Sequence, residues 1–99
     1  MDNYLDFGDR IYRLACELYK LKHLNRRKRT KNEWLYLLKK QVEYGELLFG
    51  YNNYMLGLYK NKHSEIKKEF EFQTNAAKNI LLDYRDQYLD FIEYIEEKH

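Results

Sequence analysis

Proline is absent from all 99 residues of this chain, and only four positions are glycine. Because proline is the strongest breaker of helices, no residue here forces a long helix to end. Apolar residues recur every three or four positions rather than every second position, which is the period of an amphipathic helix and not of a strand. The sequence therefore predicts an all-α fold.

Three stretches follow this period, and two polar segments separate them. We expect helices over about residues 3–24, 31–60 and 65–97, with a basic loop over residues 25–31. Thr30 and Glu33 have the spacing of a capping box, which places the start of the second helix. The first helix has its apolar residues at steps of three and four, a heptad-type seam formed by Tyr4, Phe7, Ile11, Leu14, Leu18 and Leu21.

Together these helices predict one domain over residues 1–99, an elongated three-helix bundle with up-down connections and antiparallel coiled-coil-like packing. A second arrangement stays open, because Gly50 and the three residues after it also suit a helix end. A break over residues 50–53 would give a four-helix bundle.

The third helix is expected to be longer than the first by about ten residues, at 1.5 Å per residue. Part of the apolar stripe of the third helix therefore extends beyond the end of the first helix and is not covered by it. Because an uncovered apolar stripe usually packs against another chain, the sequence also predicts a homodimer that uses the uncovered parts of the second and third helices.

Charge is segregated along the chain. Residues 21–40 hold eight basic residues and one acidic residue, which gives 8 − 1 = +7, whereas the whole chain has a net charge of +2. Arginine and lysine in such a segment favour an acidic protein surface or phosphate groups. Aromatic rings that follow directly are able to stack on bases. The candidate partner-binding residues are Lys22, Arg26, Arg27, Lys28, Arg29, Lys31, Trp34 and Tyr36.

Three interpretations of this basic segment remain open at the level of sequence: a solvated loop, a contact with an acidic protein, and a contact with nucleic acid. The modest net charge of the chain weighs against nucleic acid. The turn is also too long and too basic for a helix-turn-helix motif.

Eleven tyrosines cannot all lie inside a thin bundle, so several are expected at its edge. The simplest interpretation is boundary packing of an amphipathic side chain, and the functional one is a recognition surface, because tyrosine is enriched at interface hot spots. The possible interface tyrosines are Tyr51, Tyr54, Tyr59 and Tyr88.

A run of acidic residues follows the third helix at steps of three and four, and so forms one stripe. The favoured interpretation is a solvated helix face, or a stripe that meets the basic loop of a second subunit; the alternative is a mimic of a phosphate backbone. The stripe consists of Asp83, Asp86, Asp90, Glu93 and Glu97.

No segment carries a recognisable catalytic, cofactor or metal motif. There is no phosphate-binding loop and no dinucleotide fingerprint, and the three histidines lack zinc spacing. Cys16, the single cysteine, is expected to be a buried or half-buried packing residue rather than a nucleophile. We therefore expect no enzymatic activity, no cofactor and no metal ion.

No stretch has the length and apolarity of a membrane span, and the first residues lack the pattern of a secretory signal. The sequence thus predicts a cytoplasmic protein that does not enter a membrane.

In general profile, a short, proline-free helical chain without catalytic motifs resembles the accessory proteins of phages and other mobile elements. That resemblance is one of overall character, and no particular stretch carries it. It implies a small non-catalytic protein that regulates or inhibits a protein or nucleoprotein partner by protein–protein contact, as anti-defence inhibitors do. The alternative hypothesis is a nucleic-acid-binding accessory protein that uses the basic segment 22–31.

Overall fold

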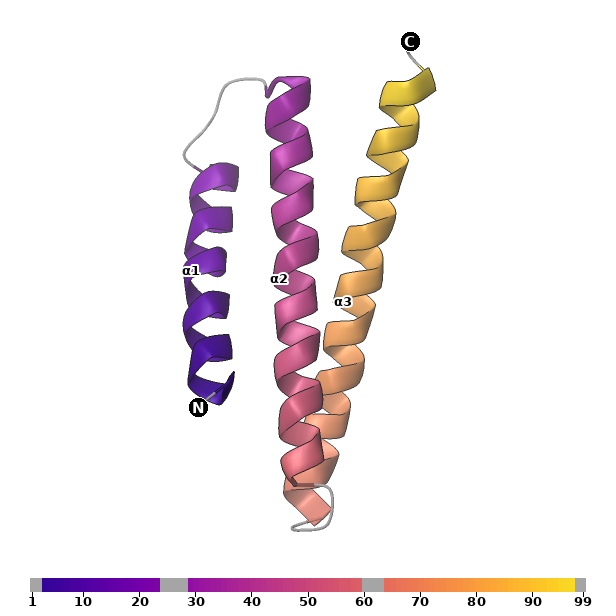
Figure 1. Cartoon of the computed structure of the whole chain (residues 1–99). Helices are drawn as coiled ribbons and strands as arrows, with labels where there is room; N and C mark the ends of the chain where they lie inside the picture. Colours follow the sequence, from indigo (N-terminus) through magenta and orange to yellow (C-terminus); the bar gives the residue numbers. More distant parts are fainter. Residues whose placement is uncertain (1–2, 24–28, 60–63, 98–99) are drawn as a thin grey trace.

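The computed structural model describes the backbone of residues 3–23, 29–59 and 64–97, and the side chains of residues 7–23, 29–59 and 65–97. These ranges contain three helices, α1 (Asn3–His23), α2 (Lys31–Leu58) and α3 (Ser64–Glu97). The helices lie side by side, and the chain reverses direction between one helix and the next (Figure 1). The predicted all-α three-helix bundle is confirmed.

The start of α2 is fixed by the side chains that the sequence singled out. Glu33 donates its backbone N–H to Thr30 Oγ1 over 3.2 Å, and Thr30 donates its own N–H to Glu33 Oε1 over 2.8 Å. These reciprocal bonds form the predicted capping box, which satisfies two backbone donors that would otherwise lack partners. The helix then continues through residues 50–53 without interruption, so the break that would have made a fourth helix is absent.

α2 lies between α1 and α3 and contacts both (Figure 1). Within the described ranges, no Cα atom of α1 comes within 8 Å of a Cα atom of α3. The sequence of α2 explains this arrangement, since its buried leucines include the adjacent pair Leu37 and Leu38, which point about 100° apart around the helix. The bundle is therefore an open layer of three helices rather than a closed triangle.

The longer contact joins α2 to α3. Gly45 lies against Leu81, and the ring of Tyr59 stacks on a phenylalanine near the start of α3, Phe70, at 5.6 Å between centroids. Steps of three and four from these contacts define what we name the α2–α3 seam. It consists of Trp34, Leu38, Gln41, Gly45, Leu48, Asn52, Met55 and Tyr59 of α2, and Phe70, Thr74, Ala77, Leu81, Tyr84, Tyr88, Phe91 and Ile95 of α3.

The seam is closest at Gly45. A Cβ atom built at this position would lie 3.0 Å from Leu81 Cα and 3.2 Å from Leu81 Cδ1. Because one of these atoms belongs to the backbone, a side chain here would push the two helices apart. The glycine is thus a packing residue that lets α3 approach α2.

Three polar side chains are buried in the seam. Gln41 Oε1, Asn52 Oδ1 and Thr74 Oγ1 have no hydrogen-bond partner among the described atoms. The amide nitrogen of Asn52 does donate to Leu48 O, over 2.9 Å. A buried oxygen without a partner opposes folding, because it loses its bonds to water. These three unpaired oxygens therefore lower the stability of the contact between α2 and α3.

The molecule exposes much surface for its size. Its accessible area is 7467 Å², whereas a compact monomer of its 12.4 kDa exposes about 6,100 Å². Its radius of gyration is 16.3 Å, against about 13 Å for a compact domain of this length. In the described part of the chain no large side chain is completely buried. A single layer of three helices therefore has only a thin core.

Replacing Gly45 with alanine tests the close approach. We expect G45A to lower the free energy of unfolding by about 1–3 kcal/mol, because the added methyl group meets the backbone of α3. The measurement is urea unfolding followed by circular dichroism.

Gly8 is the matched control for this substitution, because a Cβ atom there would meet nothing within 4 Å. We expect G8A to raise the free energy of unfolding by up to about 1 kcal/mol, since alanine is the better helix former. Equal effects of the two variants would contradict the packing role of Gly45.

Thr74 allows a test of the unpaired oxygens. We expect T74V to raise the free energy of unfolding by about 1 kcal/mol, because valine has nearly the same shape and needs no hydrogen bond. The same substitution at the helix cap, T30V, is expected to lower it by about 1 kcal/mol, since Thr30 accepts a bond there. If T74V also destabilises the fold, the Thr74 hydroxyl has a partner in solution.

Candidate partner-binding site

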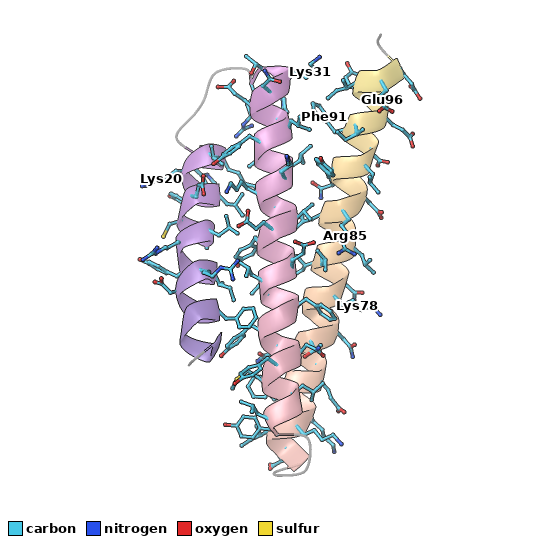
Figure 2. All side chains as sticks on the ribbon, in the orientation of Figure 1. Lys20, Lys31, Lys78, Arg85, Phe91 and Glu96 are labelled. Carbon is cyan, nitrogen blue, oxygen red and sulfur yellow. The ribbon has the colours of Figure 1, made fainter. Side chains whose placement is uncertain are left out.

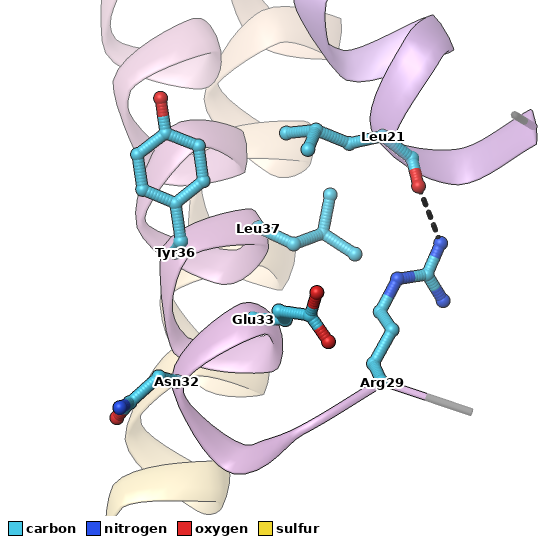
Figure 3. A pocket seen from close by; sticks show the side chains of 6 residues that line it. All are labelled: Leu21, Arg29, Asn32, Glu33, Tyr36 and Leu37. Atoms are coloured by element: carbon cyan, nitrogen blue, oxygen red, sulfur yellow. Dashed lines mark hydrogen bonds between the residues drawn. The ribbon is translucent and has the colours of Figure 1, made fainter. Parts of the chain in front are cut away.

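Arg29 is the first residue described after the basic loop, and it connects two helices. Its Nη2 atom donates a hydrogen bond of 2.7 Å to the backbone carbonyl of Leu21, in the last turn of α1 (Figure 3). The last carbonyls of a helix have no partner within the helix, so this bond caps α1. Its guanidinium also lies over the ring of Trp34, 4.9 Å from the centroid. A cation over an indole ring is attracted by the electrons of that ring.

A pocket of about 210 Å³ opens beside this contact, between the end of α1 and the start of α2. Figure 3 shows its side chains, with the guanidinium of Arg29 turned toward α1 and the carboxylate of Glu33 on the α2 side. Both charged groups are already engaged, Arg29 with the carbonyl and Glu33 with the capping box. The pocket is lined by Leu21, Arg29, Asn32, Glu33, Tyr36 and Leu37.

A larger cleft of about 490 Å³ lies between the first turns of α2 and the last turns of α3. Its walls are mostly apolar, and the rings of Trp34 and Phe91 face each other across it at 6.5 Å between centroids. Asp90 and Gln87 contribute polar groups to the lining. Trp34 keeps 38% of its surface exposed although it contacts Arg29 and Phe91.

A cluster of hydrogen-bonded polar and charged side chains joins α1 to α2. The Tyr36 hydroxyl donates to Glu17 Oε2, and Lys40 Nζ lies 4.0 Å from Glu17 Oε1 and 3.4 Å from Glu43 Oε1. The hydrogen bond to Glu17, with partial desolvation, raises the pKa of Tyr36. Desolvation lowers the pKa of Lys40, but the carboxylates of Glu43 and Glu17 outweigh it and leave that pKa raised. Both groups therefore stay protonated at neutral pH and hold α1 in place.

The predicted basic site residues are only partly described by the structure. Arg26, Arg27 and Lys28 lie outside the described residues. Lys22 is exposed in the last turn of α1, and Lys31 is exposed as the first residue of α2. In the described part of the chain, Lys22 forms no ion pair.

Most of the predicted interface tyrosines are half-buried, and three of them pack against other aromatic rings. Tyr51 and Tyr54 lie beside Phe7 of α1, at 6.4 Å between centroids in each pair, and only Tyr54 is exposed. Tyr59 stacks on Phe70, and Tyr88 is half-buried. Their role in partner binding stays a prediction.

All five members of the acidic stripe are exposed on α3: Asp83, Asp86, Asp90, Glu93 and Glu97. None of them forms an ion pair with another described residue. The stripe thus leaves its negative charge open to a partner. At the same end of the molecule, α1 and α2 carry basic side chains, as the positions of Lys20, Lys31 and Glu96 show (Figure 2).

The most exposed of the described aromatic side chains were not among the predicted site residues. Tyr12 and Tyr19 of α1 are 70% and 62% exposed, and Phe72 of α3 is 74% exposed. The spacing of seven residues between the two tyrosines, next to the apolar seam of α1, is the signal that would have identified them as one stripe. The Tyr19 ring lies 4.5 Å from the ring of His23, between centroids, and all three aromatic side chains remain open to solvent.

Within the ranges searched, no group of three histidine, cysteine, aspartate or glutamate side chains is placed to hold a metal ion. Cys16 is exposed, which corrects the expectation that it would be buried or half-buried. It lies one turn from Tyr12, on the face of α1 opposite the apolar seam.

No family model, no curated protein and no solved structure matches this chain. Among the helices as far as they are described, none is long and apolar enough to span a membrane.

Arg29 provides a test of this end of the bundle. We expect R29A to lower the free energy of unfolding by about 1–2 kcal/mol, since it removes a charged hydrogen bond and the contact with Trp34. Replacing the exposed and unpaired Lys22, in K22A, is expected to change it by less than about 0.5 kcal/mol. If R29A and K22A change the free energy of unfolding equally, in thermal or urea unfolding, the contacts of Arg29 do not stabilise the fold.

Proposed function

We propose that this chain is a small non-catalytic binding protein that regulates or inhibits a macromolecular partner by protein–protein contact. The observation that carries the proposal is the exposure of large apolar side chains on every helix, while none in the described part is completely buried. Contiguous exposed apolar surface on a soluble protein marks an interaction site. Aromatic residues and arginine, which dominate interface hot spots, are both present here.

The recognition surface of this proposal is the end of the bundle that joins α1 to α2. There, Lys22 and Lys31 supply positive charge, and Trp34 and Tyr36 supply half-exposed rings. In this proposal α2 and α3 form an antiparallel coiled coil, a rigid support that presents the surface without reorganisation. Inhibition is the specific activity suggested by the general resemblance to accessory proteins of phages and other mobile elements.

The alternative, a nucleic-acid-binding accessory protein using the basic segment 22–31, has less support. Arg29 is engaged with Leu21 and Trp34, and the Trp34 ring is covered by Arg29 on one side and faces Phe91. Arg29 thus already occupies one face of the ring on which a base would stack. A contact with an acidic protein surface needs only exposed positive charge, which Lys22 and Lys31 supply.

Charge reversal in the basic segment tests the proposal. We expect the double variant R26E/R27E to lose capture of the partner from an extract of the source cell, because the contact depends on positive charge. The control is K67E/K68E, which changes the net charge equally at the other end of the bundle and should capture the partner as the parent does. Circular dichroism verifies that both variants keep their helices. Equal capture by all three proteins would exclude the basic segment.

Fluorescence anisotropy with labelled DNA and RNA at 50 and 200 mM salt decides between the two functions. The proposal expects no binding at micromolar protein concentration. Binding that weakens steeply with salt, as release of counterions from phosphates demands, would establish the nucleic-acid function instead.

A further inference from the structure

One flank of α1 and one flank of α3 lie on the same side of the three-helix layer. On α1, Glu17 reaches Tyr36 and Lys40 on the side that faces away from α3. Positions 12, 19 and 22 each follow a residue of the α1 seam, whereas Glu17 precedes one, so they lie on the opposite flank. Tyr12, Tyr19 and Lys22 therefore face the side of α1 that is turned toward α3.

On α3, the corresponding flank is identified in the same way. The ion pair between Arg85 and Glu46 lies on one side of the α2–α3 seam, and both residues directly follow a seam position. Ile80, Asp90 and Tyr94 directly precede seam positions, so they lie on the other side. That is also the side of α2 on which α1 packs, since Leu37 and Tyr51, which contact α1, precede seam positions as well.

We name this side the open face and define it by Tyr12, Tyr19 and Lys22 of α1, and Ile80, Asp90 and Tyr94 of α3. All six side chains are exposed. Because α1 and α3 do not approach each other in the described ranges, the two flanks form separate edges of one face. The α1 edge carries positive charge, and the α3 edge carries negative charge.

Residues on the α1 edge and on the α3 edge can be compared by their height, that is, their position along the long axis of the bundle. Leu21 of α1 lines a pocket with Leu37 of α2, and the ring of Phe7 lies 3.4 Å from the position of a Cβ atom at Gly50, so α1 runs along α2 in a fixed register. The contact between Gly45 and Leu81 fixes the register of α3 on α2.

Combining the two registers, at 1.5 Å per residue in each helix, places Tyr12 level with Ile80 and Lys22 level with Asp90. Tyr12 and Lys22 on the α1 edge thus each have a counterpart on the α3 edge at the same height, whereas Tyr19 lies level with residues 87–88. The α1 and α3 edges also run in the same direction, from the lower to the upper end in Figure 1.

A face with these properties is complementary to itself. Rotation by 180° about an axis parallel to the helices keeps every height and brings the α1 edge of one copy against the α3 edge of the other. Such a two-fold interface uses the same patch on both subunits, and the contact occurs twice. We infer that the open face is the interface of a homodimer, in which Tyr12 packs near Ile80 of the second copy and Lys22 pairs with its Asp90.

The area left exposed fits this assembly. The chain, at 7467 Å², exposes about 1,300 Å² more than a compact monomer of its mass. A standard specific interface buries about 800 Å² on each partner. The excess is therefore large enough to supply one such interface. This assignment differs from the sequence-based expectation, which placed the dimer contact on the uncovered parts of the second and third helices.

Charge exchange across the interface tests the inference directly. For the parent protein at 10–100 µM and 50 mM salt, sedimentation equilibrium is expected to give the mass of two chains. K22E and D90K are each expected to weaken dimerisation on the order of tenfold or more, because each places two like-charged pairs in the interface. An equimolar mixture of the two variants is expected to recover the dimer, since both pairs in the mixed dimer are then attractive.

The matched control is K78E, an exposed lysine on the opposite flank of α3, which should dimerise as the parent does. Circular dichroism of each variant verifies the fold. A parent mass of one chain at 100 µM would overturn the inference, and so would a dimer that both variants weaken but their mixture does not restore. Sedimentation is measured on the pure protein, so its result does not depend on partner capture. The dimer and the proposed function can therefore be contradicted independently of each other.

Discussion

Both outer helices pack on α2, and no Cα atom of one comes within 8 Å of a Cα atom of the other in the described ranges. This dependence explains why the apolar residues of α2 are spread around its axis, whereas α1 and α3 each bury one stripe. Leu37 is directed to α1 and Leu38 to α3, from adjacent positions of one helix. A helix that packs on two sides cannot also offer a clean polar face, and α2 accordingly keeps Trp34, Tyr36, Tyr54 and Leu58 exposed.

The contact between α2 and α3 combines close packing with polar burial. Gly45 brings the helices together, while Gln41, Asn52 and Thr74 place oxygens without described partners in the same seam. Leucine at these positions would give a more stable seam, but a uniform seam would also fit in shifted registers. A single buried polar residue can specify the register of a coiled coil at a cost in stability. We therefore interpret the three polar residues as register markers.

The two proposals follow from one property, the openness of the layer. A closed three-helix bundle would cover the flanks of α1 and α3 that here carry Tyr12, Tyr19 and Tyr94. The end that joins α1 to α2 is organised differently, because Arg29 and the capping box fix it by hydrogen bonds rather than by apolar burial. One region thus suits apolar contact with a second copy, and the other suits recognition of a charged partner.

From sequence alone, the absence of proline, the period of the apolar residues and the capping box at Thr30 determined the all-α class and the start of α2, because these are local properties of the chain. The charge segregation was also readable. Only the tertiary structure decided that α1 and α3 pack on different sides of α2, that α2 is unbroken at Gly50, and that the most exposed of the described tyrosines lie on α1. Helical spacing tells which residues share a face, but which neighbour covers that face depends on how the helices pack, and that is set by contacts between residues far apart in the chain.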